Sequence, residues 1–264
     1  MDIFQAIFLA LVQGITEFLP VSSSGHLILA SNLLGWTDQG LEFDVAVHLG
    51  SLVAVIVFFR KDLIRLTTSW LASIFKRHMD GDAILAWQLF VVTIPTSVVA
   101  WVFSDFIEMH FRSLSVVASA TIFFGLLLGL ADISRETDAP LETLSWRDSF
   151  LVGCAQICAL VPGASRSGVT MAAALALGYS RSVSARFSFL MALPIIFLSG
   201  VYKTTQSMWE ETLLIPLLIG VIVSAMSAYF CIGIFLRFIQ RIGMIPFVIY
   251  RLILGSVLLF VGLN

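Results

Sequence analysis

The sequence predicts an all-α integral membrane protein with six transmembrane helices and two re-entrant helical hairpins, arranged as an inverted-topology repeat. Of its 264 residues, 59% are hydrophobic and only 12% are charged. A soluble domain carries about twice this charged fraction, so the composition excludes ordinary soluble proteins. Long apolar segments recur along the chain, and a similar polar motif interrupts them once in each half. The basic residues are scattered, so we expect no nucleic-acid partner.

The first half begins with two short apolar segments that Pro20 separates. Each has about half the apolar content of a full membrane span, so we expect a hairpin that enters and leaves the bilayer on the same side. The hairpin segments are residues 2–18 and 22–35, and the full spans that follow are residues 43–59, 83–104 and 114–131. Residues 60–82 are expected to form a polar loop. In the third span, Gly125 and Gly129 have the spacing that lets two helices approach closely.

The pattern restarts after the most polar segment, residues 132–147, which we expect to join the two halves as a loop. Pro162 again separates two short apolar segments. The second hairpin comprises residues 148–161 and 165–178, and the spans that follow are residues 185–203, 211–236 and 245–263. We therefore expect one membrane domain over residues 1–264, with repeat halves at 1–131 and 148–264.

Lysine and arginine residues set the expected orientation, because cytoplasmic loops carry an excess of both. With six spans, most of these residues fall on one side, in residues 60–82, 132–147, 178–184 and 237–244. That side is predicted to be cytoplasmic, and both termini are predicted to lie outside. The first hairpin then enters from outside and the second from the cytoplasm, an inverted topology that commonly places a site at the midplane. Eight spans would scatter the basic residues over both faces.

The two polar motifs share a length and a chemistry. Residues 13–25 and 156–168 both run from a Gln to a Gly. Between these two residues, each motif has a proline followed by a cluster of serines. Serines at a helix start cap free N–H groups, and a helix N-terminus attracts anions, above all phosphate. Two such ends facing each other, with the planar cation Arg166 beside them, favour a phosphate or pyrophosphate ligand. We interpret the motifs as two halves of one site.

Glu17, Ser23 and His26 add groups that can react as well as bind. Ser23 is a candidate nucleophile or phosphate ligand, and His26 is a candidate acid, base or nucleophile. Glu17 can bind a divalent metal, activate water or orient His26. Mg²⁺ binds through one or two carboxylates together with substrate phosphates and water, which suits a motif with so few acids. These groups meet the needs of phosphoryl transfer, namely charge neutralisation, a nucleophile and a proton donor.

Structural roles compete with these functional ones. The serines can act only as helix caps, and Arg166 can form a purely structural pair with Glu17. Arg251 lies inside the last expected span, where it can pair, extend to the interface or reach phosphate. For His48, which lies in the first span with Asp44, a packed or capping role is favoured. The three cysteines lie in apolar segments and are expected to be buried thiols without disulfides.

Three stretches resemble a known family, namely Glu17-Phe-Leu-Pro-Val-Ser-Ser-Ser-Gly-His26, Pro162-Gly-Ala-Ser-Arg-Ser-Gly168 with Thr170, and Ile245-Pro-Phe-Val-Ile-Tyr-Arg251. Over essentially its whole length, the chain resembles the bacterial undecaprenyl pyrophosphate phosphatases of the bacitracin-resistance type. The resemblance implies a multi-pass enzyme of the bacterial inner membrane. The count of lysine and arginine residues predicts that its site is open to the periplasmic side. The implied enzyme would remove the terminal phosphate of undecaprenyl pyrophosphate, giving undecaprenyl phosphate and inorganic phosphate, and so recycle the lipid carrier of peptidoglycan synthesis. The implied cofactor is a divalent cation, Mg²⁺ or Ca²⁺, and a homodimer is left open.

By this resemblance, the catalytic residues would be Glu17, Ser23, His26 and Arg166, with Glu17 also the metal ligand. The residues expected to support the substrate phosphates are Gln13, Ser22, Ser24, Ser165, Ser167, Thr170 and Arg251. One position departs from the family pattern, because many members have a second glutamate where this chain has Gln13. Gln13 cannot supply that charge, so Glu17 must carry more of any metal binding. The Gln13 amide oxygen is on the same helix face and can still bind.

Two other functions compete with this one. A transporter or flippase for a lipid phosphate or an anion would also have an inverted repeat. A lipid phosphatase of the acid-phosphatase type would also use a Ser-Gly-His and an Arg, but the sequence lacks the Lys-x6-Arg-Pro motif of that type. We rank this last type lowest.

Overall fold

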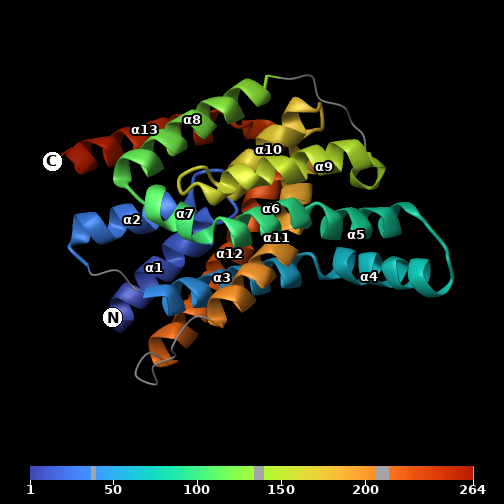
Figure 1. The fold of residues 1–264 in the computed structure, drawn as a ribbon, viewed down its shortest axis with the longest axis horizontal. Coiled ribbons are helices and arrows are strands. Elements are labelled where there is room, and N and C mark those ends of the chain that lie inside the picture. The colour runs from blue at the N-terminus through green and yellow to red at the C-terminus, as the bar shows by residue number, and fades with distance from the viewer. Residues whose placement is uncertain (37–39, 134–139, 206–213, 264) are drawn as a thin grey trace.

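The computed structural model in Figure 1 describes residues 1–36, 40–133, 140–205 and 214–263. In these residues the chain forms helices and turns without a β-strand, so the predicted all-α class is confirmed. Six of the described helical segments are long and apolar enough to cross a membrane. Residues 134–139 of the expected central loop, and residues 211–213 at the expected start of the fifth span, lie outside the described residues.

The N-terminal segments form the helices that the hydropathy predicts. They are α1 (Ile3–Thr16), α2 (Ser23–Leu34) and α3 (Gly40–Phe58). Asp2 caps α1 by accepting a hydrogen bond from Gln5 N at 2.7 Å, and the Gln5 side chain accepts one from Asp2 N at 3.2 Å. This reciprocal box satisfies N–H groups that the first turn of a helix leaves open. Pro20 lies in the break between α1 and α2, where its ring prevents the helix from continuing.

The expected polar loop over residues 60–82 is wrong, because most of it is the amphipathic helix α4 (Arg60–Phe75). Apolar side chains on one face of α4 pack against the core, namely Leu63, Leu66 and Trp70. The charged face is paired through tertiary contacts, since Arg186 Nη2 lies 3.0 Å from Asp62 and Arg65 Nη2 lies 2.8 Å from Glu142. These partners are distant in sequence and could not be recognised from it. The density of charged residues in this segment therefore suggested a loop.

The expected second span is divided into α5 (Gly81–Val91) and α6 (Thr93–Val102) by an interruption at Val92. Pro95 lies in the first turn of α6, where its missing N–H costs little. Gly153 packs so tightly on the interruption that a Cβ there would lie 2.7 Å from the Val92 carbonyl oxygen. A short helix that was not expected, α7 (Ser104–His110), precedes α8 (Leu114–Ala131), which matches the third expected span.

The second half also begins with short, interrupted helices and continues with long ones. It contains the 3-10 turn η1 (Leu141–Thr143), α9 (Trp146–Ala155), the 3-10 helix η2 (Gln156–Leu160) and α10 (Arg166–Ala176). The long helices are α11 (Arg181–Thr204), α12 (Leu214–Ile242) and α13 (Ile245–Leu263). The expected loop over residues 237–244 shrinks to a turn at Gly243, whose φ of 70° suits a glycine after a helix end.

Small residues let two pairs of spanning helices pack closely. Gly50 of α3 meets the backbone of α12 with no room for a Cβ. On α8, Gly125 faces Arg251 and Gly129 faces Val248, both of α13. The close approach that the spacing of these two glycines predicts is therefore confirmed.

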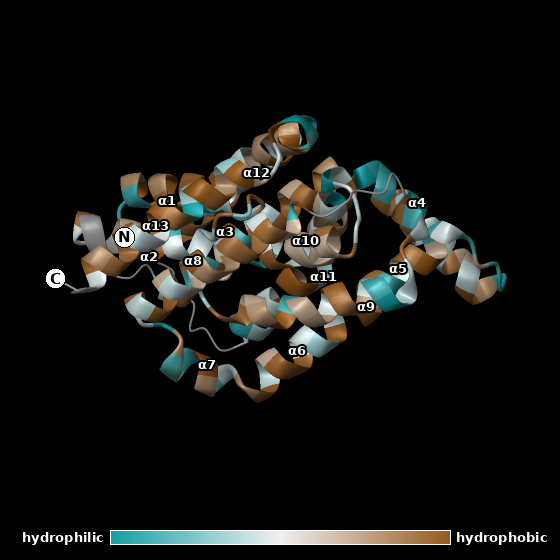
Figure 2. Cartoon of the chain, turned by 90° about the horizontal axis from the view of Figure 1, so that it is seen from above, coloured by the Kyte–Doolittle hydropathy of each residue, from teal (hydrophilic) through white to brown (hydrophobic). Residues whose placement is uncertain are grey.

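Both chain termini lie at one end of the molecule, and the turn between α4 and α5 lies at the opposite end (Figure 1). Figure 2 shows hydrophobic residues along most of the helices and hydrophilic residues on α4. Large apolar side chains are exposed on the spanning helices, for example Phe123 of α8, Ile222 of α12 and Ile253 of α13. An exposed apolar surface of this extent fits a lipid environment.

Candidate active site

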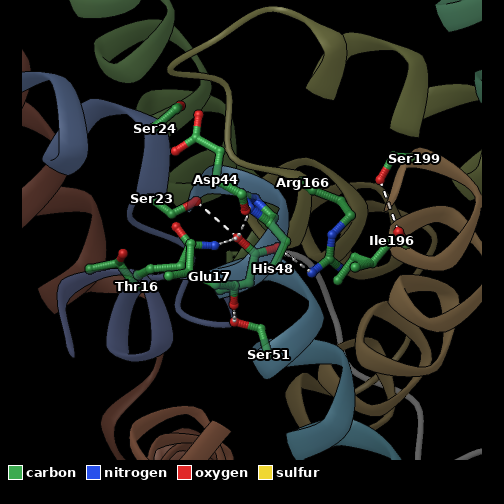
Figure 3. Close-up of polar contacts among 12 residues, drawn as sticks. Thr16, Glu17, Ser23, Ser24, Asp44, His48, Ser51, Arg166, Ile196 and Ser199 are labelled. Carbon is green, nitrogen blue, oxygen red and sulfur yellow. Dashed lines mark hydrogen bonds and ion pairs between the residues drawn. The ribbon is translucent and has the colours of Figure 1, made fainter. Parts of the chain in front are cut away.

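Glu17 follows α1 directly, and its carboxylate is the meeting point of the two polar motifs (Figure 3). Its Oε1 accepts a hydrogen bond from Arg166 Nη2 at 3.0 Å, across 149 positions of sequence. Its Oε2 accepts from Gln13 Nε2 at 3.0 Å and from Ser23 Oγ at 2.9 Å. The side chain is only 8% exposed, so these donors replace most of the water that would solvate the charge. The structure thus joins both motifs at one carboxylate.

Arg166 is the first residue of α10, and its guanidinium is fixed from several sides. Besides the Glu17 contact, Nη1 donates to the Ser188 carbonyl at 3.1 Å, and Cζ lies 5.6 Å from the centre of the Phe18 ring. Thr170, one turn later, donates to the Arg166 carbonyl at 2.8 Å. The guanidinium borders the cavity described below. A planar cation held in this way is suited to binding phosphate oxygens.

The helices α2 and α10 begin with the same local geometry. The serines that precede them, Ser22 and Ser165, both have positive φ values, 73° and 67°. Each hydroxyl caps its helix by accepting from the backbone N–H three residues later, at 3.3 Å and 3.2 Å respectively. L-residues rarely adopt positive φ, and such strain is typical of functional sites. Ser23 and Arg166 follow the two strained serines, so they occupy equivalent positions at two helix starts.

The two serine turns are also linked to each other. Gly163 N donates to Ser24 Oγ at 3.2 Å, and Ser167 Oγ donates to the Leu19 carbonyl at 2.9 Å. Within each turn, the two flanking serine hydroxyls share a hydrogen bond, 3.3 Å long in the first and 3.2 Å in the second. These contacts hold the two helix starts in a fixed relation, which is the condition for binding one ligand between them.

A cavity of about 290 Å³ with a partly polar lining opens beside this group. Its walls include side chains from both motifs and from three further helices, namely Glu17, Ser23, Ser24, Ser165, Arg166, Gln156, His48, Thr96 and Ser199. Among the described residues, several that the sequence suggested are not part of the lining: Gln13, Ser22, His26, Ser167, Thr170 and Arg251. A larger cavity of about 520 Å³ between α1, α12 and α13 is almost wholly apolar. We therefore place the chemistry in the smaller one.

Arg251, which was expected to bind phosphate, does not line this cavity. It is fully buried, and its guanidinium donates to four backbone carbonyls at 3.0–3.3 Å. The acceptors are Pro20 in the first break, Gly163 and Ala164 in the second break, and Thr121 on α8. Because Nε and both terminal nitrogens have carbonyl partners, the structure uses this cation to tie the two breaks together.

His48 borders the cavity, although the sequence favoured a packed or capping role for it. Its Nε2 lies 3.7 Å from Glu17 Oε2, and its side chain is 36% exposed. Its Nδ1 lies 2.7 Å from the Asp44 carbonyl oxygen, which can only accept, so Nδ1 carries a proton and Nε2 is directed at Glu17. The sequence did contain a signal, since an ionisable residue inside an apolar span is commonly functional.

His26, which was expected to be catalytic, is held outside the cavity wall. Its Nδ1 donates to the Ser22 carbonyl at 2.7 Å, and its Nε2 accepts from the Tyr250 hydroxyl at 2.6 Å. The His26 and Tyr250 rings stack with their centres 5.4 Å apart. Both ring nitrogens are therefore engaged, and one of them fixes the carbonyl of the strained Ser22.

The surroundings of Glu17 fit a divalent cation that takes further ligands from its substrate. The described part of the chain contains no group of three or more His, Cys, Asp or Glu side chains that could hold a metal ion. Beside Glu17, however, Gln13 Oε1 is a buried oxygen for which the described residues offer no hydrogen-bond partner. Mg²⁺ commonly uses one or two protein oxygens and completes its shell with water and substrate phosphates. Glu17 and Gln13 would be the residues that hold the implied cation, once the Gln13 amide turns its oxygen toward Glu17.

The fold and the site together define a polytopic, all-helical membrane protein with a buried ion pair and a partly polar cavity beside two helix N-termini. The chain belongs to the family of the bacitracin resistance protein BacA, whose model matches residues 6–257. It is 54% identical to undecaprenyl-diphosphatase 2 of Stutzerimonas stutzeri (strain A1501), with 98% of each chain covered. It is 51% identical to an undecaprenyl-diphosphatase of Saccharophagus degradans (strain 2-40 / ATCC 43961 / DSM 17024), with 97% of each chain covered. The family that the three motifs suggested is confirmed.

Proposed function

We infer that the chain hydrolyses undecaprenyl pyrophosphate to undecaprenyl phosphate and inorganic phosphate, and so recycles the lipid carrier of peptidoglycan synthesis. The observation that carries this inference is the group at the cavity wall, in which Glu17 binds both Arg166 and the Ser23 hydroxyl. The relatives of 51–54% identity are named undecaprenyl-diphosphatases, and they match this chain over nearly their whole length.

Positive charge and N–H donors would bind the pyrophosphate. Arg166 supplies a permanent cation at the cavity wall, and the starts of α2 and α10 offer helix N-termini, which favour anions. Negative charge develops on the leaving oxygen as its bond to phosphorus breaks. A cation that is fixed before the reaction stabilises this charge without reorganisation. Mg²⁺ or Ca²⁺ held at Glu17 and Gln13 would neutralise further charge on the phosphate oxygens.

Ser23, Glu17 and His48 would supply the attacking group and the proton acceptors. The Ser23 hydroxyl already donates to Glu17 Oε2 at 2.9 Å, so the Glu17 carboxylate can accept its proton. This hydroxyl, or a water in the same place, bonds to the terminal phosphorus while the bond to the bridging oxygen breaks. The electron pair of that bond stays with undecaprenyl phosphate. Attack by water gives inorganic phosphate directly, whereas attack by Ser23 gives a phosphoserine, which a water then hydrolyses to inorganic phosphate and the free hydroxyl. Glu17 takes the proton, with His48 Nε2 3.7 Å away as the next acceptor, and His26 positions Ser22.

We further propose that the two broken segments, α1–α2 and α9–α10, are re-entrant hairpins of inverted topology. In Figure 1, α1 and α2 lie toward the end that carries both termini, and α9 begins toward the opposite end. The matching positive φ values of Ser22 and Ser165 also support an internal repeat. The distribution of lysine and arginine favours a periplasmic position for the end with the termini. On this orientation the site is open to the periplasmic side of the inner membrane.

A transporter or flippase for a lipid phosphate is the second candidate, and it is not favoured. The compared relatives are named as phosphatases. A hydroxyl whose proton is already directed at a buried carboxylate is a reactive group that transport alone does not need.

Purified protein in detergent is expected to release inorganic phosphate from C55 prenyl pyrophosphate. We expect EDTA to lower the rate at least about tenfold, because the cation neutralises charge on the reacting phosphate, and added Mg²⁺ or Ca²⁺ to restore it. The measurement is the initial rate of phosphate release with and without the chelator. A folded protein that binds the lipid but releases no phosphate with any metal would contradict the function. Lipid counterflow in sealed vesicles would then identify a transporter.

A further inference from the structure

Gln156 has no hydrogen-bond partner for its side chain, although it is buried at the cavity. It is the first residue of η2 and is 0% exposed. Within the described residues, neither Oε1 nor Nε2 of its amide is paired, and the residue lines the same cavity as Arg166 and Ser23. An unpaired buried amide lowers stability, and nearly all buried polar groups in folded proteins are paired. A ligand in the cavity is the natural partner for this amide.

A difference between the two polar motifs explains why this amide has no hydrogen-bond partner. Gln156 begins the second polar motif, as Gln13 begins the first. In the first motif, the residue four positions later is Glu17, which accepts a hydrogen bond from Gln13 Nε2 at 3.0 Å. In the second motif, the equivalent residue is Leu160, which also lines the cavity and cannot accept a hydrogen bond. The glutamine of the first motif therefore has an acceptor for its N–H donors within the protein, whereas the glutamine of the second motif has none.

The other neutral polar side chains on this part of the wall already have acceptors. The Thr96 hydroxyl donates to the Gly153 carbonyl at 3.3 Å, and the Ser199 hydroxyl donates to the Ile196 carbonyl at 3.0 Å. Arg166 is divided between Glu17 and the Ser188 carbonyl. The Gln156 amide therefore offers N–H donors that the protein itself has not used.

We propose that Gln156 is a substrate-binding residue, whose Nε2 donates to the phosphate of the pyrophosphate that Arg166 does not hold. A pyrophosphate has two phosphates joined by one oxygen, so a cavity that selects it over a single phosphate needs donors at two places. Arg166 and the start of α10 provide one place, and Gln156 provides the other. This inference rests on the proposed function and deepens it, because it assigns the preference for a pyrophosphate to a named side chain.

Two glutamine variants with opposite expected effects test the proposal. Gln88 is also buried, at 1% exposure, but its Nε2 donates to the Leu144 carbonyl at 2.8 Å and it does not line the cavity. We expect Gln156→Leu to unfold at an equal or higher temperature than the unchanged protein, with kcat/KM about tenfold lower. We expect Gln88→Leu to unfold at a lower temperature, with kcat/KM unchanged.

Ligand binding without turnover provides a second readout. Inorganic pyrophosphate is expected to raise the unfolding temperature of the unchanged protein more than inorganic phosphate does at the same concentration. Gln156→Leu is expected to lose this difference, through about tenfold weaker pyrophosphate binding and unchanged phosphate binding.

Unchanged pyrophosphate binding and unchanged kcat/KM in Gln156→Leu would overturn the proposal. A drop in unfolding temperature like that of Gln88→Leu, with kcat/KM retained, would also overturn it, since the amide would then be structural. If the unchanged protein releases no phosphate, the proposed function fails, whereas binding of pyrophosphate that depends on Gln156 would still support the inference.

Discussion

Replacing Arg166 with lysine is expected to lower kcat/KM for phosphate release by about a thousandfold or more. Lysine keeps the positive charge but has no planar fork, so it cannot contact Glu17 Oε1, the Ser188 carbonyl and the substrate at the same time. The charge would then have to reorganise as the bond to phosphorus breaks, which is what a fixed cation avoids. The measurement is steady-state kinetics on C55 prenyl pyrophosphate in detergent.

Arg112 provides a matched control for this prediction. It also pairs with a glutamate, with Nη2 at 2.7 Å from Glu108, but its side chain is 62% exposed. We expect Arg112→Lys to leave kcat/KM unchanged, because exposed pairs contribute little. We also expect added guanidine to restore part of the activity of Arg166→Ala. A kcat/KM for Arg166→Lys within about tenfold of the unchanged protein would remove Arg166 from the centre of the mechanism.

Replacing Arg251 with methionine is expected to lower the free energy of unfolding by at least about 3 kcal/mol. Methionine fills much of the space but donates no hydrogen bond, so carbonyls of Pro20, Gly163 and Ala164 lose a buried donor. The two breaks also lose the cation that joins them, so the activity of the folded fraction should fall as well. Thermal or denaturant unfolding in detergent measures the stability, and phosphate release per folded molecule measures the activity.

Arg237 on α12 is the control for this second prediction, because it is exposed. We expect Arg237→Met to change stability by less than about 0.5 kcal/mol. Arg251→Lys should also be destabilised, because a single ammonium cannot replace donors that point to both breaks. Stability equal to that of the unchanged protein in Arg251→Met would contradict the structural role of this residue.

Hydropathy was sufficient to locate the spanning helices and the two breaks, because each span must bury a long apolar stretch and each break contains a proline. It was not sufficient for α4. The apolar stripe of that helix faces the core, and its charges pair with Arg186 and Glu142 from distant parts of the chain. A local sequence pattern does not contain such partners. For the same reason, hydropathy did not predict that α12 continues to Ile242.

The site shows the same division between local and tertiary information. Glu17, Ser23 and Arg166 were identified because polar groups in apolar surroundings are rare and costly. Whether a side chain faces the cavity depends on how its helix is rotated and packed, which the motif does not specify. His48 and Gln156 therefore line the cavity, whereas His26 and Arg251 form hydrogen bonds elsewhere and do not line it. The sequence motifs alone could not distinguish the two sets, because both lie in or beside the same motifs or spans.

Glu17 and Arg166 are expected to act as one unit on the substrate, and a double-mutant cycle of kcat/KM measures this most directly. The four proteins are the unchanged chain, Glu17→Gln, Arg166→Lys and the double variant. The double variant is expected to be within about threefold of the slower single variant, because changing either residue already disrupts the ion pair that joins the two motifs. Losses that multiply would show two residues acting independently, and would contradict a single site built from both motifs.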